Sequence, residues 1–199
     1  MEIIDISYDL MDSPIYPGNP HPEFFVLSRI SDGGGCNKSA VNTCVHNATH
    51  IDAPLHFLEG GTPIDEVSPE LFIGPCKVIE VSEGPITGEF VNKRFPKKCE
   101  RILIKGGGRA WFMDSSAEEA AELGIKLIGT DACSIGCSGN QLKPHKAFLS
   151  RGIPILEGLN LENVSPGDYF LCALPLKIGG AEAAPARAVL VKDYIFWSK

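Results

Sequence analysis

Short runs of β-branched and aromatic residues recur along the chain, and turn-forming residues bound each of them. Runs of this length and composition are typical of β-strands rather than of helices. A chain built this way must bury sheet surface to be stable. We therefore predict strands at residues 3–6, 24–30, 77–81, 102–104, 126–128, 153–156, 169–172 and 188–191.

Helix signals interrupt the strands in three places, at residues 87–95, 117–123 and 144–152. Ser115 and Glu118 have the spacing of a capping box at the start of the second helix. The strands come in groups with the helices inserted between them, an order that fits neither a TIM barrel nor a dinucleotide-binding sheet. We predict an α/β fold with mixed β-sheets and inserted helices.

Length and composition favour one ordinary globular domain. The 199 residues suit a single core, which we expect to span residues 1–199, and 44% apolar and 22% charged residues are close to the globular average. The net charge of -7, with scattered Lys and Arg, argues against nucleic acid and anionic lipid as partners. The glycine run 106–108 lacks the lysine of a phosphate loop and is predicted to be a turn.

The cellular compartment is indicated by the cysteines and the start of the chain. The seven cysteines form no Cys-x-x-Cys pair, which favours reduced thiols over a disulfide framework. Cys133 and Cys137 are the only close pair, and we interpret them as structural or incidental thiols rather than zinc ligands. The first residues do not form a signal peptide, and no apolar run is long enough to cross a bilayer. We expect a cytoplasmic protein without a membrane partner.

Residues 44–57 hold three of the five histidines, at positions 46, 50 and 56, together with Asp52. Even-numbered positions project to one side of an extended chain. Full extension would still separate positions 46 and 50 by about 13 Å, whereas bonds to one ion are about 2 Å long. The backbone must therefore bend, and the small Ala48 is the expected place. The residue types favour a metal site, with a solvated or core histidine cluster as the alternative.

A second pair of candidate ligands lies further along the chain. A helix leads away from His145, and a strand beginning at Ile153 leads back to Glu157, at about 1.5 and 3.3 Å per residue respectively. His145 and Glu157 should then finish near the same end of the domain. The alternatives are a histidine at a helix start and a surface glutamate at a strand end.

The histidine segment, residues 46–56, reads HNATHIDAPLH. It resembles the signature His-x-Gly-Thr-His-x-Asp-x-Pro-x-His of the cyclase family of metal-dependent hydrolases, which includes bacterial kynurenine formamidase and isatin hydrolase; Ala48 replaces the glycine. Further similar segments follow over nearly the full length, at residues 16–20, 129–131, 144–145, 155–159, 175–181 and 184–188. The resemblance implies a swivelling β/β/α fold and a homodimer or homotetramer.

The resemblance also implies roles for individual residues. One or two divalent ions per subunit would be bound, zinc being the first expectation and manganese an alternative, with the ligands His46, His50, Asp52, His145 and Glu157. Asp52 would bridge the two ions, and His56 would be the catalytic acid and base. Ligands of this kind also suit iron.

By the same resemblance, the expected reaction is hydrolysis of a C–N amide bond, with an aromatic N-formyl amine such as N-formylkynurenine as the substrate. Trp111, Phe24 and Phe25, with Phe57, are candidates for an aromatic pocket, although aromatic residues more often fill cores. Ser134-Ile135-Gly136 replaces the family's common Ser-Val-Asp and lacks its carboxylate. The alternatives are a lyase, a ring-closing enzyme or another cyclic-amide hydrolase of the family, and a non-catalytic metal-binding module.

Overall fold

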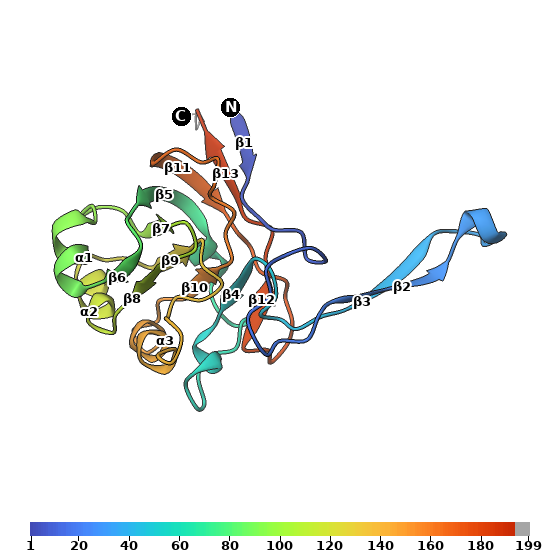
Figure 1. The fold of residues 1–199 in the computed structure, drawn as a ribbon, viewed down its shortest axis with the longest axis horizontal. Coiled ribbons are helices and arrows are strands. Elements are labelled where there is room, and N and C mark those ends of the chain that lie inside the picture. Colours follow the sequence, from blue (N-terminus) through green and yellow to red (C-terminus); the bar gives the residue numbers. More distant parts are fainter. Residues whose placement is uncertain (194–199) are drawn as a thin grey trace.

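The computed structural model describes residues 1–193, and one large sheet organises them (Figure 1). The nine strands of this sheet lie in the order β1-β13-β11-β5-β7-β9-β10-β4-β12. Their bounds are Glu2–Asp5, Val189–Lys192, Gly167–Cys172, Ile73–Glu80, Arg101–Lys105, Leu127–Thr130, Ile155–Glu157, His50–Asp52 and Ala183–Pro185. The four strands from β5 to β10 are parallel, and the strands outside them pair antiparallel, so the sheet is mixed.

Smaller elements surround this sheet. β2 (Glu23–Ser28) pairs with β3 (Lys38–Asn42), and β6 (Gly84–Ile86) pairs with β8 (Ala110–Phe112). The helices are α1, α2 and α3, at Gly88–Arg94, Ser115–Glu122 and Leu142–Leu149, with short 3₁₀ helices at Ile30–Asp32, Pro54–His56 and Pro69–Phe72. No helix in residues 1–193 is both long and apolar enough to span a membrane.

The core lies on both faces of the sheet because the strand residues alternate. Ile102 and Ile104 of β7 pack in the cluster that α1, α2 and α3 cover, which includes Phe148. Leu103, between them, points to the opposite face and packs with Leu156 of β10 in a second cluster. The central strands are therefore buried on both sides, as expected for the parallel part of a sheet.

Every strand and helix predicted from the sequence is present, with ends shifted by a few residues. The capping box is the exception. Asp114, not Ser115, is the N-cap of α2, and the Ser115 hydroxyl instead accepts a hydrogen bond from the Gly88 backbone N–H at 3.1 Å. Thr87 does cap α1, because its hydroxyl accepts the Phe90 N–H. Strands β3, β4, β6, β8 and β12 were not predicted from the sequence.

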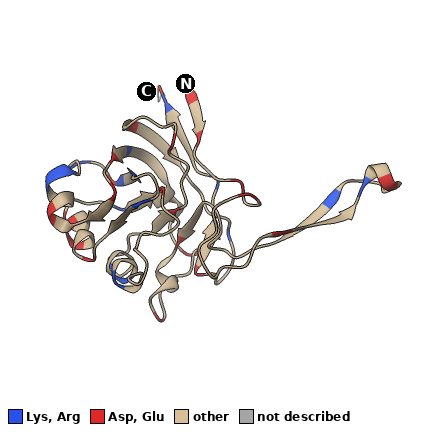
Figure 2. Ribbon diagram, in the orientation of Figure 1, with Lys and Arg blue, Asp and Glu red and all other residues tan. Residues whose placement is uncertain are grey.

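The hairpin of β2 and β3 projects from the body as a long arm, residues 22–43 (Figure 1). Its charged residues gather toward the tip, while most of its length is uncharged (Figure 2). Exposed on the arm are the large apolar residues Phe24, Phe25, Val26, Leu27, Ile30 and Val41. Exposed apolar patches of this size are common at interaction sites of proteins.

Candidate metal centre

The pairing of β4 with β10 places the first candidate ligands. The two strands are antiparallel, with His50 opposite Glu157 and Ile51 opposite Leu156. His50 and Asp52 are two residues apart and share a face, the same face that carries Glu157. Ile51 and Leu156 point the other way into the apolar core. The sheet thus presents three ligand-type side chains at one point of its helix-covered face.

A bend before β4 brings in His46, at the position expected from the sequence. Ala48 has φ of 56°, in the left-handed region. Gly158, with φ of 65°, approaches so closely that a Cβ there would clash with the Ala48 carbonyl. The bend carries His46 back toward the strand, where its Nδ1 lies 2.9 Å from Asp52 Oδ1.

Helix α3 supplies His145. Its Nε2 lies 3.2 Å from Glu157 Oε1 and 3.6 Å from Asp52 Oδ2, so the predicted return of the chain to one end of the domain is confirmed. Its other ring nitrogen, Nδ1, lies 2.7 Å from the Gln141 carbonyl oxygen. A carbonyl oxygen can only accept a hydrogen bond, so Nδ1 carries a hydrogen, and Nε2 is the nitrogen that faces the cluster and can bind a metal once it is deprotonated.

His56 lies beside this group, at the end of the 3₁₀ helix that begins at Pro54. Its ring centroid is 4.1 Å from that of His46 and 5.7 Å from that of His145. Two sets of three potential ligands share Asp52, with the donor atoms of each set within 4.8 Å of one another; they are His46, Asp52 and His56, and His50, Asp52 and Glu157. The structure therefore gathers all the predicted ligands and His56 in one cluster.

Three buried polar atoms of this cluster form no hydrogen bond within residues 1–193, although histidine nitrogens lie 2.9–3.6 Å from the Asp52 oxygens. Asp52 is fully buried, and neither of its carboxylate oxygens accepts a hydrogen bond from the residues that the structure describes. The same holds for His50 Nε2. Burying such groups unpaired costs several kcal/mol or more, and a bound cation removes this cost. The oxygen and imidazole donors fit a divalent metal ion.

The pKa shifts of these groups also indicate that the cluster favours positive charge. Burial alone would lower the pKa of His50, but the carboxylates of Glu157 and Asp52 raise it to about 9. Burial acts the same way on His145, and the same carboxylates raise its pKa to about 10. Burial would raise the pKa of Asp52, but the neighbouring imidazoles, His145 foremost, hold it well below its usual range. His56 differs, because burial lowers its pKa to about 4.

A hydrogen-bond network that the sequence analysis did not predict holds Glu157. Its Oε1 accepts the Ile135 backbone N–H at 2.6 Å, and the Ser134 hydroxyl lies 3.4 Å from the same oxygen. Ser134 also donates to Gln141 Oε1 at 2.6 Å. A Cβ on Gly136 would lie 2.6 Å from that Gln141 oxygen, so Gln141 fills the space beside the glycine. Gly136 stands where the family commonly has the aspartate of Ser-Val-Asp, and the Gln141 side chain occupies the space beside it.

A cavity of about 310 Å³ opens above the cluster. Its wall includes His56, Phe57 and Tyr16, and the Phe57 ring stacks on that of His145 with centroids 4.5 Å apart. The volume is in the range of small-molecule sites, roughly 300–1,000 Å³. Tyr16 was not predicted as a pocket residue, although it lies in a segment, residues 16–20, that the sequence analysis singled out.

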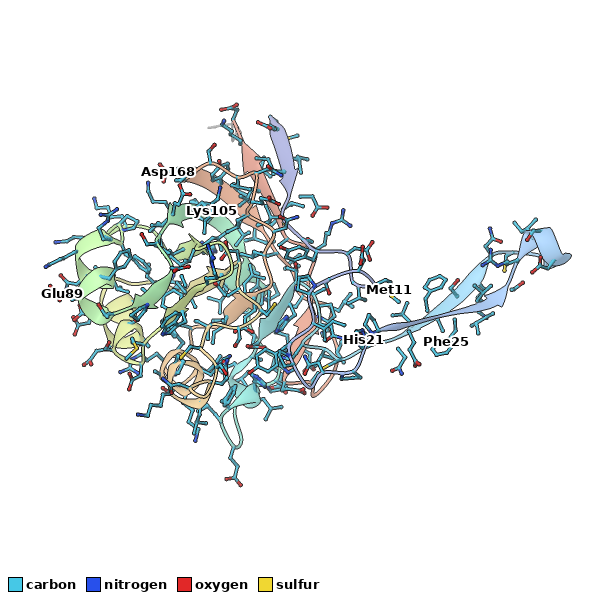
Figure 3. The ribbon with its side chains drawn as sticks, viewed as in Figure 1. Met11, His21, Phe25, Glu89, Lys105 and Asp168 are labelled. Carbon is cyan, nitrogen blue, oxygen red and sulfur yellow. The ribbon has the colours of Figure 1, made fainter. Side chains whose placement is uncertain are left out.

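The other predicted pocket aromatics have different positions. Trp111 lines a neighbouring cavity of about 500 Å³, which shares Tyr16 with the first. Phe24 and Phe25 line neither cavity; they lie on the arm, with Phe25 standing away from the body (Figure 3). Within one chain, the placement of these two phenylalanines in the pocket is wrong, because the arm extends outward and leaves them 56% and 45% exposed.

Comparisons with known proteins agree with this geometry. The chain is 37% identical over 190 residues to a kynurenine formamidase of Delftia acidovorans, covering 89% of this chain and 91% of the relative. It is 34% identical to one of Salinibacter ruber, covering 96% and 97%. Among solved structures, a predicted metal-dependent hydrolase from Bacillus stearothermophilus superposes with a TM-score of 0.81 at 29% identity, covering 95% and 97%.

Isatin hydrolase A from Labrenzia aggregata shares the fold, with a TM-score of 0.78 at 20% identity over 96% of this chain and 93% of that one. The mixed α/β architecture expected from the sequence is therefore confirmed. The Cyclase family model matches residues 4–136, which include the histidine segment. The chain belongs to the Cyclase family.

Proposed function

We propose that the protein is a metal-dependent hydrolase that cleaves N-formylkynurenine, an aromatic formamide, to kynurenine and formate. The observation that carries the proposal is the buried cluster of histidines and carboxylates around Asp52, whose oxygens accept no hydrogen bond within residues 1–193. This cluster lies at the floor of a cavity walled by Tyr16 and Phe57. The relatives named kynurenine formamidase support the choice of substrate.

The proposed metal ligands are the five residues His46, His50, Asp52, His145 and Glu157. They would hold one or two divalent ions, with zinc expected first and manganese as the alternative. When bound, such a metal lowers the pKa of water and polarises a carbonyl oxygen. Asp52 belongs to both sets of three donors, which suits it to a bridging position.

His56 is the proposed acid and base. It lines the cavity beside His46 without being one of the five proposed ligands. An imidazole nitrogen there can take the proton of the attacking water and pass it to the departing amine nitrogen as the C–N bond breaks and formate forms. The Phe57 ring stacks on that of His145 and forms an apolar part of the cavity wall.

Elemental analysis of the purified protein, combined with an assay of N-formylkynurenine with and without chelator, tests this function. We expect one or two equivalents of zinc or manganese, loss of turnover on chelation and recovery on adding the metal back. In ¹⁸O-water the label should enter formate, which distinguishes hydrolysis from lyase or ring-closing chemistry. Turnover that ignores the chelator would contradict the proposal.

The chain is further proposed to work as one domain in the cytoplasm. All seven cysteines are free thiols, including the exposed Cys36 and Cys133. Free thiols persist in reducing compartments, whereas oxidising ones favour disulfides. The two apolar clusters lie back to back on one sheet, which supports a single domain.

The homo-oligomer is proposed to form through the arm. Phe24 and its cross-strand partner Val41 stand on one face of the hairpin, while Phe25 and its partner Ala40 stand on the other. An isolated two-stranded hairpin is at best marginally stable in water, so both apolar faces need cover. A second copy of the chain supplies it if each arm packs on the other subunit, as two-fold symmetry allows.

We expect the double substitution Phe24→Lys and Phe25→Lys to convert a dimer into monomers. Each buried phenylalanine contributes about 2 kcal/mol, so dimer affinity should fall by at least about 100-fold. Sedimentation equilibrium measures the change. Leu176→Lys, at a leucine that is also exposed but lies on the body, is the matched control and should leave the mass unchanged. A monomeric wild-type protein, or a double variant that stays dimeric, would contradict the arm-mediated dimer.

A further inference from the structure

The cavity that contains Trp111 adjoins the cavity above the metal cluster. Residues that line both are Tyr16, Cys133, Ser134 and Gln141. The first cavity, about 310 Å³, already has the size of a small-molecule site. The Trp111 cavity, about 500 Å³, therefore offers room for a further part of the same ligand, beyond the group that reacts.

The walls of the Trp111 cavity are held together by Asp131. Its carboxylate accepts hydrogen bonds from the backbone N–H groups of Gly106, Gly107 and Gly108, at 2.8–3.1 Å. Gly107 and Gly108 have φ of 62° and 71°, which glycine adopts without strain. These glycines lead into Arg109 and Trp111 on one wall, while Asp131 leads into the opposite wall at Cys133. The two walls are thus fixed before a ligand arrives.

The lining offers two aromatic rings, Tyr16 and Trp111, and one cation. Ala110 and Phe112 of β8 are buried in the core, so Trp111 between them projects to the other side and is half-buried. Arg109 is the charged residue among those that line this cavity. Its Nε lies 3.2 Å from Glu83, in an ion pair exposed on both sides and therefore weak.

Arg109 retains binding capacity. The ion pair with Glu83 is made through Nε, and a guanidinium binds a carboxylate through two parallel hydrogen bonds. An aromatic ring beside the cation suits the flat or aliphatic part of a ligand that leads to such a carboxylate. The chemistry of the lining therefore selects an anionic substituent on an aromatic molecule.

We propose that the Trp111 cavity is the second half of the substrate site and receives a carboxylate-bearing side chain of the aromatic formamide, with the carboxylate on Arg109. The inference rests on the proposed function and deepens it, since it states which aromatic formamides are preferred. Arg109 is a specificity residue in this account, because it binds a part of the substrate remote from the bond that breaks.

The test compares two substrates on the metal-loaded enzyme. N-formylkynurenine carries an amino-acid side chain with a carboxylate, whereas N-formylaniline carries none. We expect Arg109→Gln to raise KM for N-formylkynurenine about tenfold, the effect of losing a hydrogen-bonded charge pair, with kcat within about twofold. KM for N-formylaniline should not change. Arg94→Gln, which removes an exposed cation on α1, is the matched control.

Calorimetric titration with kynurenine, the amine product, provides a readout that needs no turnover. Arg109→Gln should weaken kynurenine binding about tenfold, while Arg94→Gln should not. Equal kynurenine affinity in wild type and Arg109→Gln, or an equal rise in KM for both substrates, would overturn the inference. A wild-type enzyme that binds kynurenine through Arg109 but hydrolyses neither formamide would overturn the proposed function alone.

Discussion

Replacing Asp52 with asparagine should remove the bound metal and reduce kcat/KM for N-formylkynurenine by at least about a thousandfold. Asp52 is fully buried, and its oxygens lie 2.9 Å from His46 Nδ1 and 3.6 Å from His145 Nε2. Asparagine keeps the shape but removes the charge that a divalent ion needs at the centre of the cluster. A loss of about 4 kcal/mol of transition-state stabilisation corresponds to three orders of magnitude.

Metal content by elemental analysis and steady-state kinetics on the same preparation measure this effect. The matched control is Asp168→Asn, which removes a carboxylate that is 82% exposed and paired with Lys77 on the surface (Figure 3). It should leave both quantities unchanged, because exposed ion pairs contribute little. An Asp52→Asn protein that keeps its full metal content and activity would rule out a ligand role for this carboxylate.

Replacing His56 with alanine should lower kcat by about 10²–10⁴-fold while the metal content stays at the wild-type level. The expected loss is that of a group that moves a proton between water and the departing nitrogen. Its ring lies against His46, and one of its nitrogens lies within 4.8 Å of a donor atom of His46 and of Asp52. Metal content is therefore the measurement that separates the two roles open to His56.

Added imidazole should restore part of the lost turnover in His56→Ala, because it can enter the space left by the side chain. His21→Ala, at a histidine outside the cluster, is the control and should behave as wild type. Loss of metal from His56→Ala together with activity would make His56 a ligand instead. Unchanged kcat would show that proton transfer does not depend on this residue.

Much of the fold could be predicted because its longer strands carry strong local signals. The runs around Ile102 and Leu171 are rich in apolar β-branched or aromatic residues, so composition alone indicates them. β7 is buried on both faces, whereas β11 is buried at alternate positions. The missed strands are held by partners instead. β4 (His50–Asp52) consists of three residues between β10 and β12, which are too few for their alternation to be recognised in the sequence. β3 owes its existence to β2 beside it.

The residues of the candidate site also fall into those that the sequence indicated and those that it did not. The density of histidines and the return of the chain from His145 to Glu157 indicated the proposed ligands, and the structure brings them together. Ser134 and Gln141 were missed, because their role depends on hydrogen bonds between loops that sequence spacing does not encode. Phe24 and Phe25 were misplaced, since an apolar aromatic pair has the same pattern in a pocket and on an interaction surface.

The register between β4 and β10 has a consequence for folding. His50 faces Glu157 across the strands, and Ile51 faces Leu156. A slip of one residue in β4 would turn His50 and Asp52 into the apolar layer and expose Ile51 on the opposite side. Forcing such charged groups among apolar side chains costs several kcal/mol. The side chains proposed to bind metal therefore also select the correct strand alignment while the sheet assembles, before any ion or substrate is present.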